Sequence, residues 1–293
     1  MLKMQNQMTK TTTGIIIKII SNDFTVLDEL NNIHVCKARG KFRNLKITPL
    51  VGDNVVIDIE NNYILEVKKR RNELVRPSVS NIDQLFIITS VKHPNFDTNL
   101  LDKLLCIAEF NCIKPIICLT KVDLLNQEEF NDLESYIKYY KKIGYKVLVN
   151  TEINDIKELL KGKISVFTGQ SGAGKSTLLN KLDNNLDIKT NEISLALGRG
   201  KHTTRHTELM NICSGWVADT PGFSSLDFIG MSNSDIRDNF IEFQELRDKC
   251  KYKDCMHYND DHCAIKENVE NGNIIKSRYE NYIKFITRVI RWN

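Results

Sequence analysis

The sequence predicts an α/β fold, in which a parallel sheet with helices on both faces is joined to a small β-barrel and to a helical, cysteine-rich region. Three observations predict it. Short β-branched runs separated by turn residues fill the first part of the chain, strands and helices then alternate, and three cysteines and a histidine crowd together near the end. Alternating strands and helices are typical of a parallel sheet that is covered on both faces.

Composition narrows the class of protein. The chain has 293 residues, of which 41% are hydrophobic, so it can bury the cores of two or three domains of roughly 100–200 residues each. No apolar run reaches the roughly 18 residues of a membrane span, and the N-terminal residues lack the apolar core of a secretion signal. We therefore expect a cytoplasmic monomer without a membrane partner, which begins with a disordered lead-in over residues 1–13.

Residues 14–72 are predicted to form the barrel. Its expected strands are short runs rich in β-branched residues, bounded by turn signals, over residues 14–20, 23–27, 33–38, 54–59 and 63–68. This pattern fits an OB-fold, a frequent binder of oligonucleotides, and it fits an SH3-like barrel nearly as well.

The charge of this end of the chain is uneven. Residues 1–72 contain twelve Lys and Arg against seven Asp and Glu, a surplus of five, whereas the net charge of the whole chain is +4. A basic barrel indicates a nucleic-acid partner. A solvated basic face on a purely structural barrel is the alternative.

Residues 73–230 are predicted to form the α/β domain. The expected strands are residues 84–90, 116–119, 146–149 and 164–168, and the expected helices are residues 98–110, 128–142, 153–160 and 176–182. The alternation predicts helices on both faces of a parallel sheet.

A phosphate loop lies between the last of these strands and the last of these helices. The motif G-x4-G-K-[ST] is fitted by Gly169, Gln170, Ser171, Gly172, Ala173, Gly174, Lys175, Ser176 and Thr177. Glycines allow backbone N–H groups to surround phosphate oxygens, and the start of the helix adds a positive dipole end. We expect Lys175 to reach the β- and γ-phosphates and the Ser176 hydroxyl to bind Mg²⁺.

A guanine-reading motif follows the strand at residues 116–119. Its pattern, [NT]-K-x-D, is fitted by Thr120, Lys121, Val122 and Asp123. The Asp123 carboxylate can accept from both N1–H and the exocyclic amine of guanine, a pair of donors that adenine lacks. Lys121 is expected to lie along the base, and Thr120 to hold the loop. Alone the motif arises often by chance, and the phosphate loop in the same chain is what gives it meaning.

A third element, D-x-x-G, ends the apolar segment that begins at Trp216. Asp219 is expected to lie near Mg²⁺, and the backbone N–H of Gly222 to contact the γ-phosphate. The basic, glycine-bearing residues 197–207 are typical of a mobile first switch loop, in which Thr203 or, slightly favoured, Thr204 binds Mg²⁺. A solvated basic loop is the alternative.

The order of the three motifs differs from that of ordinary small GTPases, where the phosphate loop comes first. Here residues 120–123 precede residues 169–177, and residues 219–222 come last. A pocket is defined in space, so a fold can be opened at another point if its original ends lie close together. The sequence therefore predicts a circularly permuted P-loop GTPase. A P-loop ATPase or small-molecule kinase is the enzymatic alternative, and it leaves the guanine motif unexplained.

Residues 231–293 are predicted to form a helical zinc-binding domain. A helix capped near residues 232–234 would bury Ile236, Phe240, Phe243 and Leu246, and a last helix over residues 276–292 would bury Tyr279, Ile283, Ile286 and Ile290. Three thiolates and one imidazole would form a closed tetrahedral Zn²⁺ site of the structural kind from Cys250, Cys255, His257 and Cys263. His262 is a rival fourth ligand, but its neighbour Cys263 would strain a shared tetrahedron.

The combination of a basic barrel, the three motifs in permuted order and the C-x4-C-x-H-x5-C spacing resembles the bacterial ribosome small-subunit-dependent GTPase A family. The resemblance covers nearly the whole chain after the first dozen residues. It implies a GTPase that is stimulated by 30S subunits and acts late in small-subunit maturation. It also implies a barrel and a zinc domain that bind 16S rRNA, with GTP or GDP, Mg²⁺ and one structural Zn²⁺ as ligands. An RNA-binding assembly factor whose nucleotide site switches with little hydrolysis is the non-enzymatic alternative.

Two local features depart from common GTPase patterns. Phe223 stands where many GTPases keep a glutamine that positions water, so we expect slow turnover in isolation and hypothesise that His202 supplies this role on the ribosome. Residues 150–152, Asn-Thr-Glu, replace the usual Ser-Ala loop beside the base. Guanine selectivity would still rest on Asp123.

Overall fold

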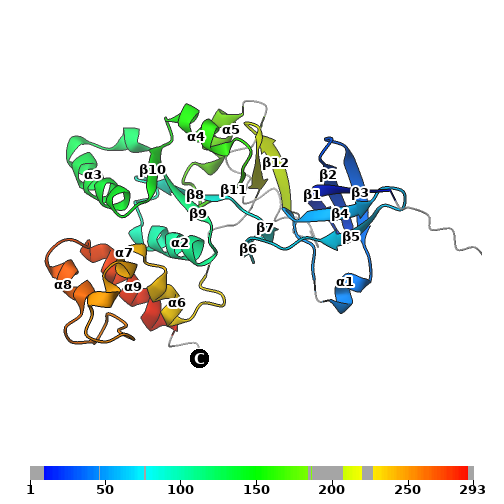
Figure 1. Cartoon of the computed structure of the whole chain (residues 1–293). Helices are drawn as coiled ribbons and strands as arrows, with labels where there is room; N and C mark the ends of the chain where they lie inside the picture. Colours follow the sequence, from blue (N-terminus) through cyan, green and yellow to red (C-terminus); the bar gives the residue numbers. More distant parts are fainter. Residues whose placement is uncertain are drawn as a thin grey trace, which may run out of the picture.

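The protein is described by a computed structural model over residues 10–45, 47–75, 77–183, 186, 207–219 and 227–289. Figure 1 shows the barrel on the right, the α/β sheet in the middle and the C-terminal helices at the lower left. Helix α2 (Thr98–Phe110) lies between the sheet and the C-terminal helices (Figure 1). The predicted three-part α/β architecture is confirmed.

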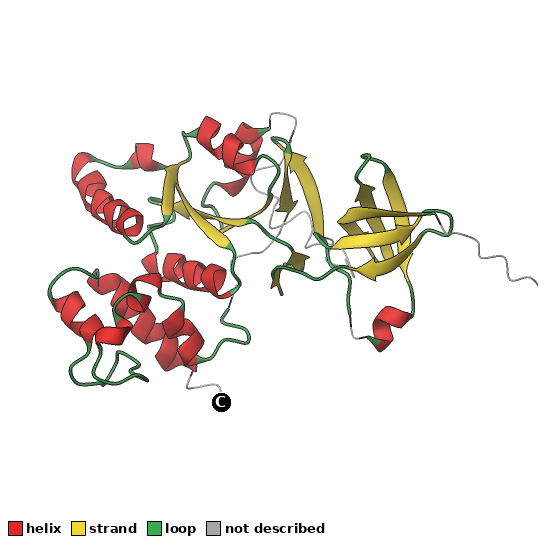
Figure 2. Cartoon of the chain, viewed as in Figure 1, coloured by secondary structure: helices red, strands yellow, loops and turns green. Residues whose placement is uncertain are grey.

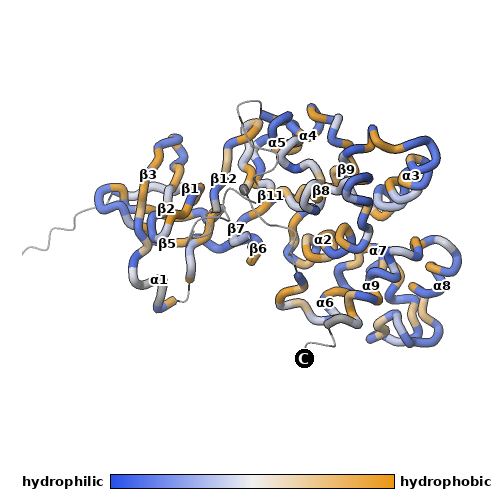
Figure 3. The backbone as a smooth tube through the Cα atoms, turned by 180° about the vertical axis from the view of Figure 1, so that it is seen from behind, coloured by the Kyte–Doolittle hydropathy of each residue, from blue (hydrophilic) through white to orange (hydrophobic). Residues whose placement is uncertain are grey.

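The barrel is built from β1 (Thr11–Ile20), β2 (Asp23–Asp28), β3 (Ile33–Ala38), β4 (Asn54–Asp58) and β5 (Tyr63–Val67). These strands pair in the order β1-β2-β3-β5-β4, and β4 returns to β1 to close the barrel. The parallel β3–β5 pair and the short helix α1 (Lys41–Asn44) after β3 decide between the two predicted barrels in favour of an OB-like one. Alternate residues of β2, namely Phe24, Val26 and Asp28, are buried, and Figure 3 shows hydrophobic and hydrophilic residues mixed along the strands of the barrel.

The barrel also corrects the sequence prediction at its edges. Strand β1 starts at Thr11, so residues 11–13 are not part of a lead-in: Thr11 pairs with Asp58 and Thr13 with Val56. The sequence prediction missed residues 11–13 because three consecutive threonines show no apolar pattern, although β-branched side chains are favoured in strands. Helix α1 and the hairpin β6 (Glu73–Leu74) to β7 (Val79–Ser80) were not predicted, because both are too short to carry a periodic pattern.

The central sheet has the strand order β10-β9-β8-β11-β13-β12, in which only the last pair is antiparallel. Its strands are β8 (Gln84–Ser90), β9 (Lys114–Thr120), β10 (Lys146–Val149), β11 (Ile164–Gly169), β12 (Thr207–Ile212) and β13 (Gly215–Asp219). Strands β8 and β11 are buried along their whole length, as expected for strands covered on both faces. Figure 2 shows these strands between helices.

Helices cover both faces of this sheet. Leu85 and Ile87 of β8 belong to the core under α2 and α3 (Gln127–Lys142). Phe86 and Ile88, which point the other way, belong to the core under α4 (Ile153–Leu160) and α5 (Lys175–Leu182). The alternation within one strand thus separates the two cores.

The barrel and the central sheet are continuous. Strand β1 is long enough to close the barrel with its first half and to pair with β12 near its end, where Lys18 lies opposite Glu208. These two side chains form an ion pair at 2.7 Å. A second attachment uses the buried Asp53 carboxylate, which accepts from Arg70 Nε at 2.7 Å and from Ser80 Oγ at 2.6 Å. The barrel is therefore fixed to the central sheet by main-chain pairing, and Asp53 ties it to Arg70 and to the β6–β7 hairpin.

The C-terminal region differs most from the prediction. Instead of one helix, α6 (Asn233–Asp238), α7 (Ile241–Gln244) and a 3₁₀ turn η3 (Arg247–Lys249) follow each other, with Ser232 as N-cap of α6. Asn239 ends α6 because its side chain donates to the carbonyl of Asp235 at 2.7 Å. Ile236, Phe240 and Phe243 are buried as predicted, whereas Leu246 is only half-buried.

The last two helices are α8 (Ala264–Glu270), which was not predicted, and α9 (Lys276–Val289). The buried face of α9 contains Ile286 as predicted, but Tyr279 and Ile283 are only half-buried, and Ile290 lies outside the described residues. The fully buried positions that the prediction missed include Arg278, Tyr282 and Phe285. No helix in the described part of the chain is long and apolar enough to cross a membrane.

Candidate functional site

The phosphate loop runs from the end of β11 to the start of α5. A Cβ atom at Gly169, where φ is 142°, would lie 2.0 Å from the carbonyl oxygen of Ile88, so only glycine fits where the loop leaves the sheet. Gly174 has φ 91° and caps α5. Lys175 Nζ donates to the carbonyls of Gly169 at 2.8 Å and Gln170 at 2.9 Å, and burial lowers the pKa of this amine. The ammonium group is thus held at the mouth of the loop, where phosphate oxygens could replace the carbonyls.

The two residues after the lysine begin α5. Ser176 is half-buried and Thr177 is exposed, in the first turn of the helix. Their place beside the loop is compatible with a metal-binding hydroxyl at Ser176.

The guanine motif lies against the phosphate loop. Thr120 ends β9 and is buried, and its Oγ1 donates to the carbonyl of Ala173 at 2.6 Å. Lys121, with φ 61°, donates through Nζ to the carbonyls of Gly172 at 2.9 Å and of His93. Two consecutive residues of one motif therefore hold the other loop by its main chain.

Asp123 is exposed in the 3₁₀ turn η1 (Val122–Leu124). Within the described ranges, no residue donates a hydrogen bond to its carboxylate, so both oxygens can accept from a base. The neighbouring strand places residues 150–152 beside this turn, since Asn150 N donates to the carbonyl of Leu119 at 2.8 Å. Glu152 Oε2 accepts from Val149 N at 2.5 Å, so this side chain closes its own turn.

The third motif is described only in part. Strand β13 is parallel to β11, with Ala218 opposite Val166, so Asp219 reaches the same edge of the sheet as the phosphate loop. The Asp219 side chain, Gly222 and Phe223 lie outside the described residues, as do His202, Thr203 and Thr204 of the predicted first switch.

The predicted metal ligands come together in the loop between η3 and α8. One donor atom from each of Cys250, Cys255, His257 and Cys263 lies within 4.8 Å of the others, and His262 is not in this group. His257 Nδ1 lies 3.6 Å from Cys250 Sγ and 3.4 Å from Cys263 Sγ.

The chemistry of these groups fits a zinc ion. Burial lowers the pKa of His257 to about 4, so its imidazole is neutral at neutral pH, which is the state that binds metal. Burial raises the pKa of the Cys255 and Cys263 thiols, so thiolates here need a cation. Three sulfurs and one nitrogen suit tetrahedral Zn²⁺.

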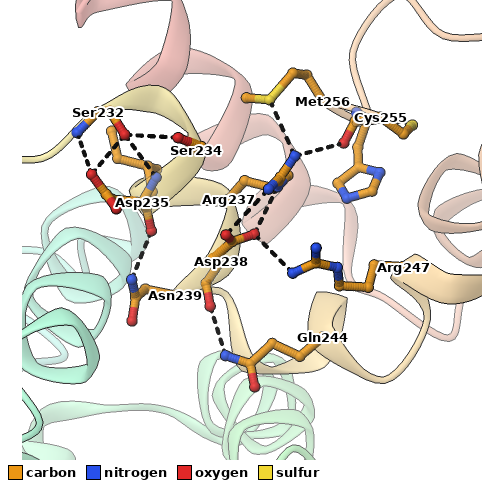
Figure 4. A network of polar contacts seen from close by, with 12 residues as sticks. Ser232, Ser234, Asp235, Arg237, Asp238, Asn239, Gln244, Arg247, Cys255 and Met256 are labelled. Carbon is orange, nitrogen blue, oxygen red and sulfur yellow. Dashed lines mark hydrogen bonds and ion pairs between the residues drawn. The ribbon is translucent and has the colours of Figure 1, made fainter. Parts of the chain in front are cut away.

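Side chains from two helices support the metal loop. Arg237 Nη1 of α6 donates to the carbonyl of Cys255 at 3.5 Å while its Nε is held by Asp238 at 2.7 Å. Figure 4 shows this guanidinium between Asp238 and the metal loop. Tyr282 and Tyr279 of α9 donate to the carbonyls of Met256 and His257, each at 2.7 Å. Sequence reasoning missed these contacts, because nothing in the spacing of α9 relates it to a loop some twenty residues earlier.

The barrel presents an exposed apolar and basic face along β3 and β5. Ile33 and Val35 are 64% and 56% exposed, and Lys37 lies opposite Tyr63 in the register. The Arg39 guanidinium lies 5.7 Å from the centre of the exposed Tyr63 ring. A second such pair occurs in the metal loop, where Lys251 Nζ lies 5.2 Å from the centre of the Tyr252 ring.

Comparison with known proteins agrees with this geometry. The family model described as RsgA GTPase matches residues 67–229, and that of the RsgA N-terminal domain matches residues 13–64. A protein from Oceanobacillus iheyensis named small ribosomal subunit biogenesis GTPase RsgA 2 is 49% identical, covering 94% of this chain and 97% of its own length. A Bacillus velezensis protein named small ribosomal subunit biogenesis GTPase RsgA is 47% identical with the same coverage.

Two solved structures are similar over nearly the whole chain. The crystal structure of YloQ, described as a circularly permuted GTPase, has a TM-score of 0.83 and 37% identity, covering 98% of both chains. That of YjeQ from Thermotoga maritima has a TM-score of 0.83 and 34% identity, covering 96% of this chain and 99% of its own.

Proposed function

The chain belongs to the RsgA GTPase family, and from this premise we propose that it hydrolyses GTP on the 30S ribosomal subunit late in the subunit's assembly. One observation carries the proposal. Thr120 and Lys121 bind the carbonyls of Ala173 and Gly172, which fixes the distance between a guanine-reading turn and a phosphate loop. A single guanine nucleotide spans such a pair of loops.

Hydrolysis would rest on positioning and charge stabilisation, without a covalent intermediate. The amides of residues 169–174 and the Lys175 ammonium would bind the phosphates, and the Asp123 carboxylate would select guanine. Ser176, Thr204 and Asp219 would hold Mg²⁺, which neutralises phosphate charge when bound. The backbone N–H of Gly222 would contact the γ-phosphate.

Water positioning is assigned to His202, once the ribosome positions this side chain. The reason is Phe223, whose apolar side chain cannot orient water. A His202→Ala protein with normal 30S-stimulated turnover would contradict this assignment.

The test of the proposed function is GTP hydrolysis by the protein alone, with 30S subunits and with 50S subunits. We expect slow turnover alone and a large rise with 30S subunits only. Turnover that neither subunit changes would contradict the ribosomal part, and ATP competing equally with GTP would contradict the guanine site.

Contact with 16S rRNA is assigned to the barrel face of Ile33, Val35, Lys37, Arg39 and Tyr63, with Lys251 and Tyr252 of the metal loop as a second contact. Exposed aromatic rings beside cations can stack on bases and bind phosphate. Tyr63→Ala should weaken binding to 30S subunits, whereas Phe130→Ala, an exposed aromatic on α3, should not. Equal weakening by both would contradict the assignment.

The remaining assignments follow from these. We infer one structural Zn²⁺ at Cys250, Cys255, His257 and Cys263, and a monomer that works in the cytoplasm. The division of labour would be an RNA-binding barrel up to residue 72, a GTPase domain over residues 73–230 and a zinc domain over residues 231–293.

A further inference from the structure

Helix α9 touches the metal loop with one side. Tyr279 and Tyr282 hold two consecutive carbonyls, those of His257 and Met256. His257 has φ 57°, a backbone conformation that side chains other than glycine rarely adopt, so an external hydrogen bond at this residue helps to hold the loop. The position of α9 and the shape of the metal loop are therefore tied together.

The adjacent side of α9 enters a buried polar cluster on α2. Arg278 is fully buried, and its Nη1 lies 2.7 Å from Asp102 Oδ1 while its Nε lies 2.5 Å from Glu242 Oε1. Tyr140 donates to Asp102 Oδ1 at 2.6 Å, and Asn281 donates to Asp102 Oδ2 at 2.7 Å. Two buried carboxylates around one guanidinium are costly to separate, because each would be left without its partner. This cluster fixes α9 to α2.

The contact continues to the first turn of α2. Asn281 Nδ2 lies 3.2 Å from Thr98 Oγ1, and Asn281 Oδ1 accepts from Asn99 Nδ2 at 3.1 Å. Asp97 caps this turn by accepting from the backbone N–H of Asn99 at 2.9 Å. The side chain of one residue of α9 thus contacts the first two residues of α2.

The loop before α2 belongs to the nucleotide site. The carbonyl of His93 accepts from Lys121 Nζ, the same amine that binds the phosphate loop at Gly172. Lys92 Nζ lies 2.8 Å from Glu129 Oε1, and Glu129 caps the helix that follows the guanine motif. Residues 92 and 93 are therefore bound to the guanine motif and to the helix after it.

We propose that helix α9 links zinc binding in the C-terminal domain to guanine-nucleotide binding, through Asn281, the first turn of α2 and the 92–97 loop. Zinc orders the loop that Tyr279 and Tyr282 hold, which fixes α9 and, through it, the loop that receives Lys121. This inference rests on the proposed GTP and zinc sites. It adds a route that is independent of the covalent connection through residues 220–232.

Linkage must be reciprocal: if GDP tightens zinc binding by some factor, zinc tightens GDP binding by the same factor. We expect a factor of about five to ten, at the low end of typical couplings between sites. Without a shared element, each ligand would bind with the same affinity whether or not the other is present.

The experiment uses the zinc-loaded full chain and measures the dissociation constant of zinc against a chromophoric chelator, with and without saturating GDP. Wild-type protein should hold zinc about five to ten times more tightly with GDP. Asn281→Ala and, separately, Tyr279→Phe should still bind zinc and GDP but lose most of this difference. Thr287→Ala is the matched control, because among the described residues Thr287 bonds only to carbonyls of its own helix.

The outcomes distinguish a failure of the linkage, a failure of the route through α9 and a failure of the zinc assignment. A wild-type zinc affinity that GDP does not change would overturn the linkage alone, and an unreduced effect in both variants would overturn the route through α9. A wild-type protein that binds GDP but no zinc would overturn the zinc assignment and the linkage together. Thermal unfolding of each variant shows whether it is folded. Tyr279→Phe removes only a hydroxyl, so its fold should be preserved.

Discussion

The nucleotide site and the metal loop are held in different ways. At the nucleotide site, parallel strands deliver two loops to one edge, glycine removes a steric conflict, and Thr120 and Lys121 bind main-chain carbonyls. The metal loop has little regular structure, and its shape depends on Arg237, Tyr279 and Tyr282 and on the ligands themselves. The first site is built into the sheet, whereas the second is a single loop that side chains from other helices hold in place.

The largest expected effect is at the nucleotide site. Lys175→Ala should reduce GTP hydrolysis by about 10²–10³-fold, the usual loss when one charge-stabilising donor is removed. Single-turnover hydrolysis measures it. Zinc content should remain that of the wild type, because Lys175 contacts only the phosphate loop in the described structure. Hydrolysis within threefold of wild type would contradict the role of Lys175.

On the metal side, Cys255→Ser should abolish zinc binding and make residues 250–263 sensitive to protease, because a structural zinc ion supplies folding free energy. Metal analysis and limited proteolysis measure it. GDP binding should weaken by no more than about tenfold, because the sheet holds the nucleotide site and the proposed linkage through α9 adds only a factor of about five to ten. Cys213→Ser, outside the cluster, is the control. Equal loss of zinc by both variants would contradict the ligand set.

A smaller effect is expected on the base selectivity of the nucleotide site. Asp123→Asn should lower GTP affinity by about 10–100-fold, since hydrogen bonds to a charged group are worth about 1.5–3 kcal/mol. Affinity for xanthosine triphosphate should rise, because that base presents an acceptor where guanine has its exocyclic amine. Competition binding measures both. Asp155→Asn, an exposed carboxylate on α4, should change neither, and unchanged GTP selectivity in Asp123→Asn would show that the base is read elsewhere.

The smallest expected effect concerns the buried cluster between the two regions. Tyr140→Phe deletes one hydroxyl that donates to Asp102 and should cost about 1–2 kcal/mol of the free energy of unfolding. Thermal unfolding should show a decrease of a few degrees in Tm. Tyr136→Phe, half-buried on the same helix, is the control. A Tm for Tyr140→Phe equal to that of the control would mean that this bond adds nothing to the cluster.

The same difference explains what the sequence could predict. The bounds of β8, β10, α2 and α4 were predicted to the residue, because buried strands and amphipathic helices carry their own periodicity. Each motif of the nucleotide site is a short run of consecutive residues, and the four predicted metal ligands lie within one short segment. Predicting them therefore required no knowledge of long-range contacts.

What could not be predicted depends on partners far away in sequence. Asp102 and Arg278 are 176 residues apart, and neither shows in a hydropathy pattern that it will be buried. The break after α6 is different: it depends on a local bond from Asn239 to the carbonyl of Asp235, which the apolar pattern of the segment does not reveal. The hydrogen bond from Lys121 to His93 likewise needs the fold before it can be seen.

The pairing of β1 with β12 has a consequence for biosynthesis. Residues 18 and 19 of β1 pair with residues 208 and 207, so this part of the strand waits until most of the chain has been made. The N-terminal barrel can close earlier through β4, but the end of β1 stays an open edge on the nascent protein, and open edges invite pairing with other chains. A chain truncated before β12 would therefore carry a barrel with that edge exposed. The β1–β12 pairing therefore covers this edge only after residue 208 has been synthesised.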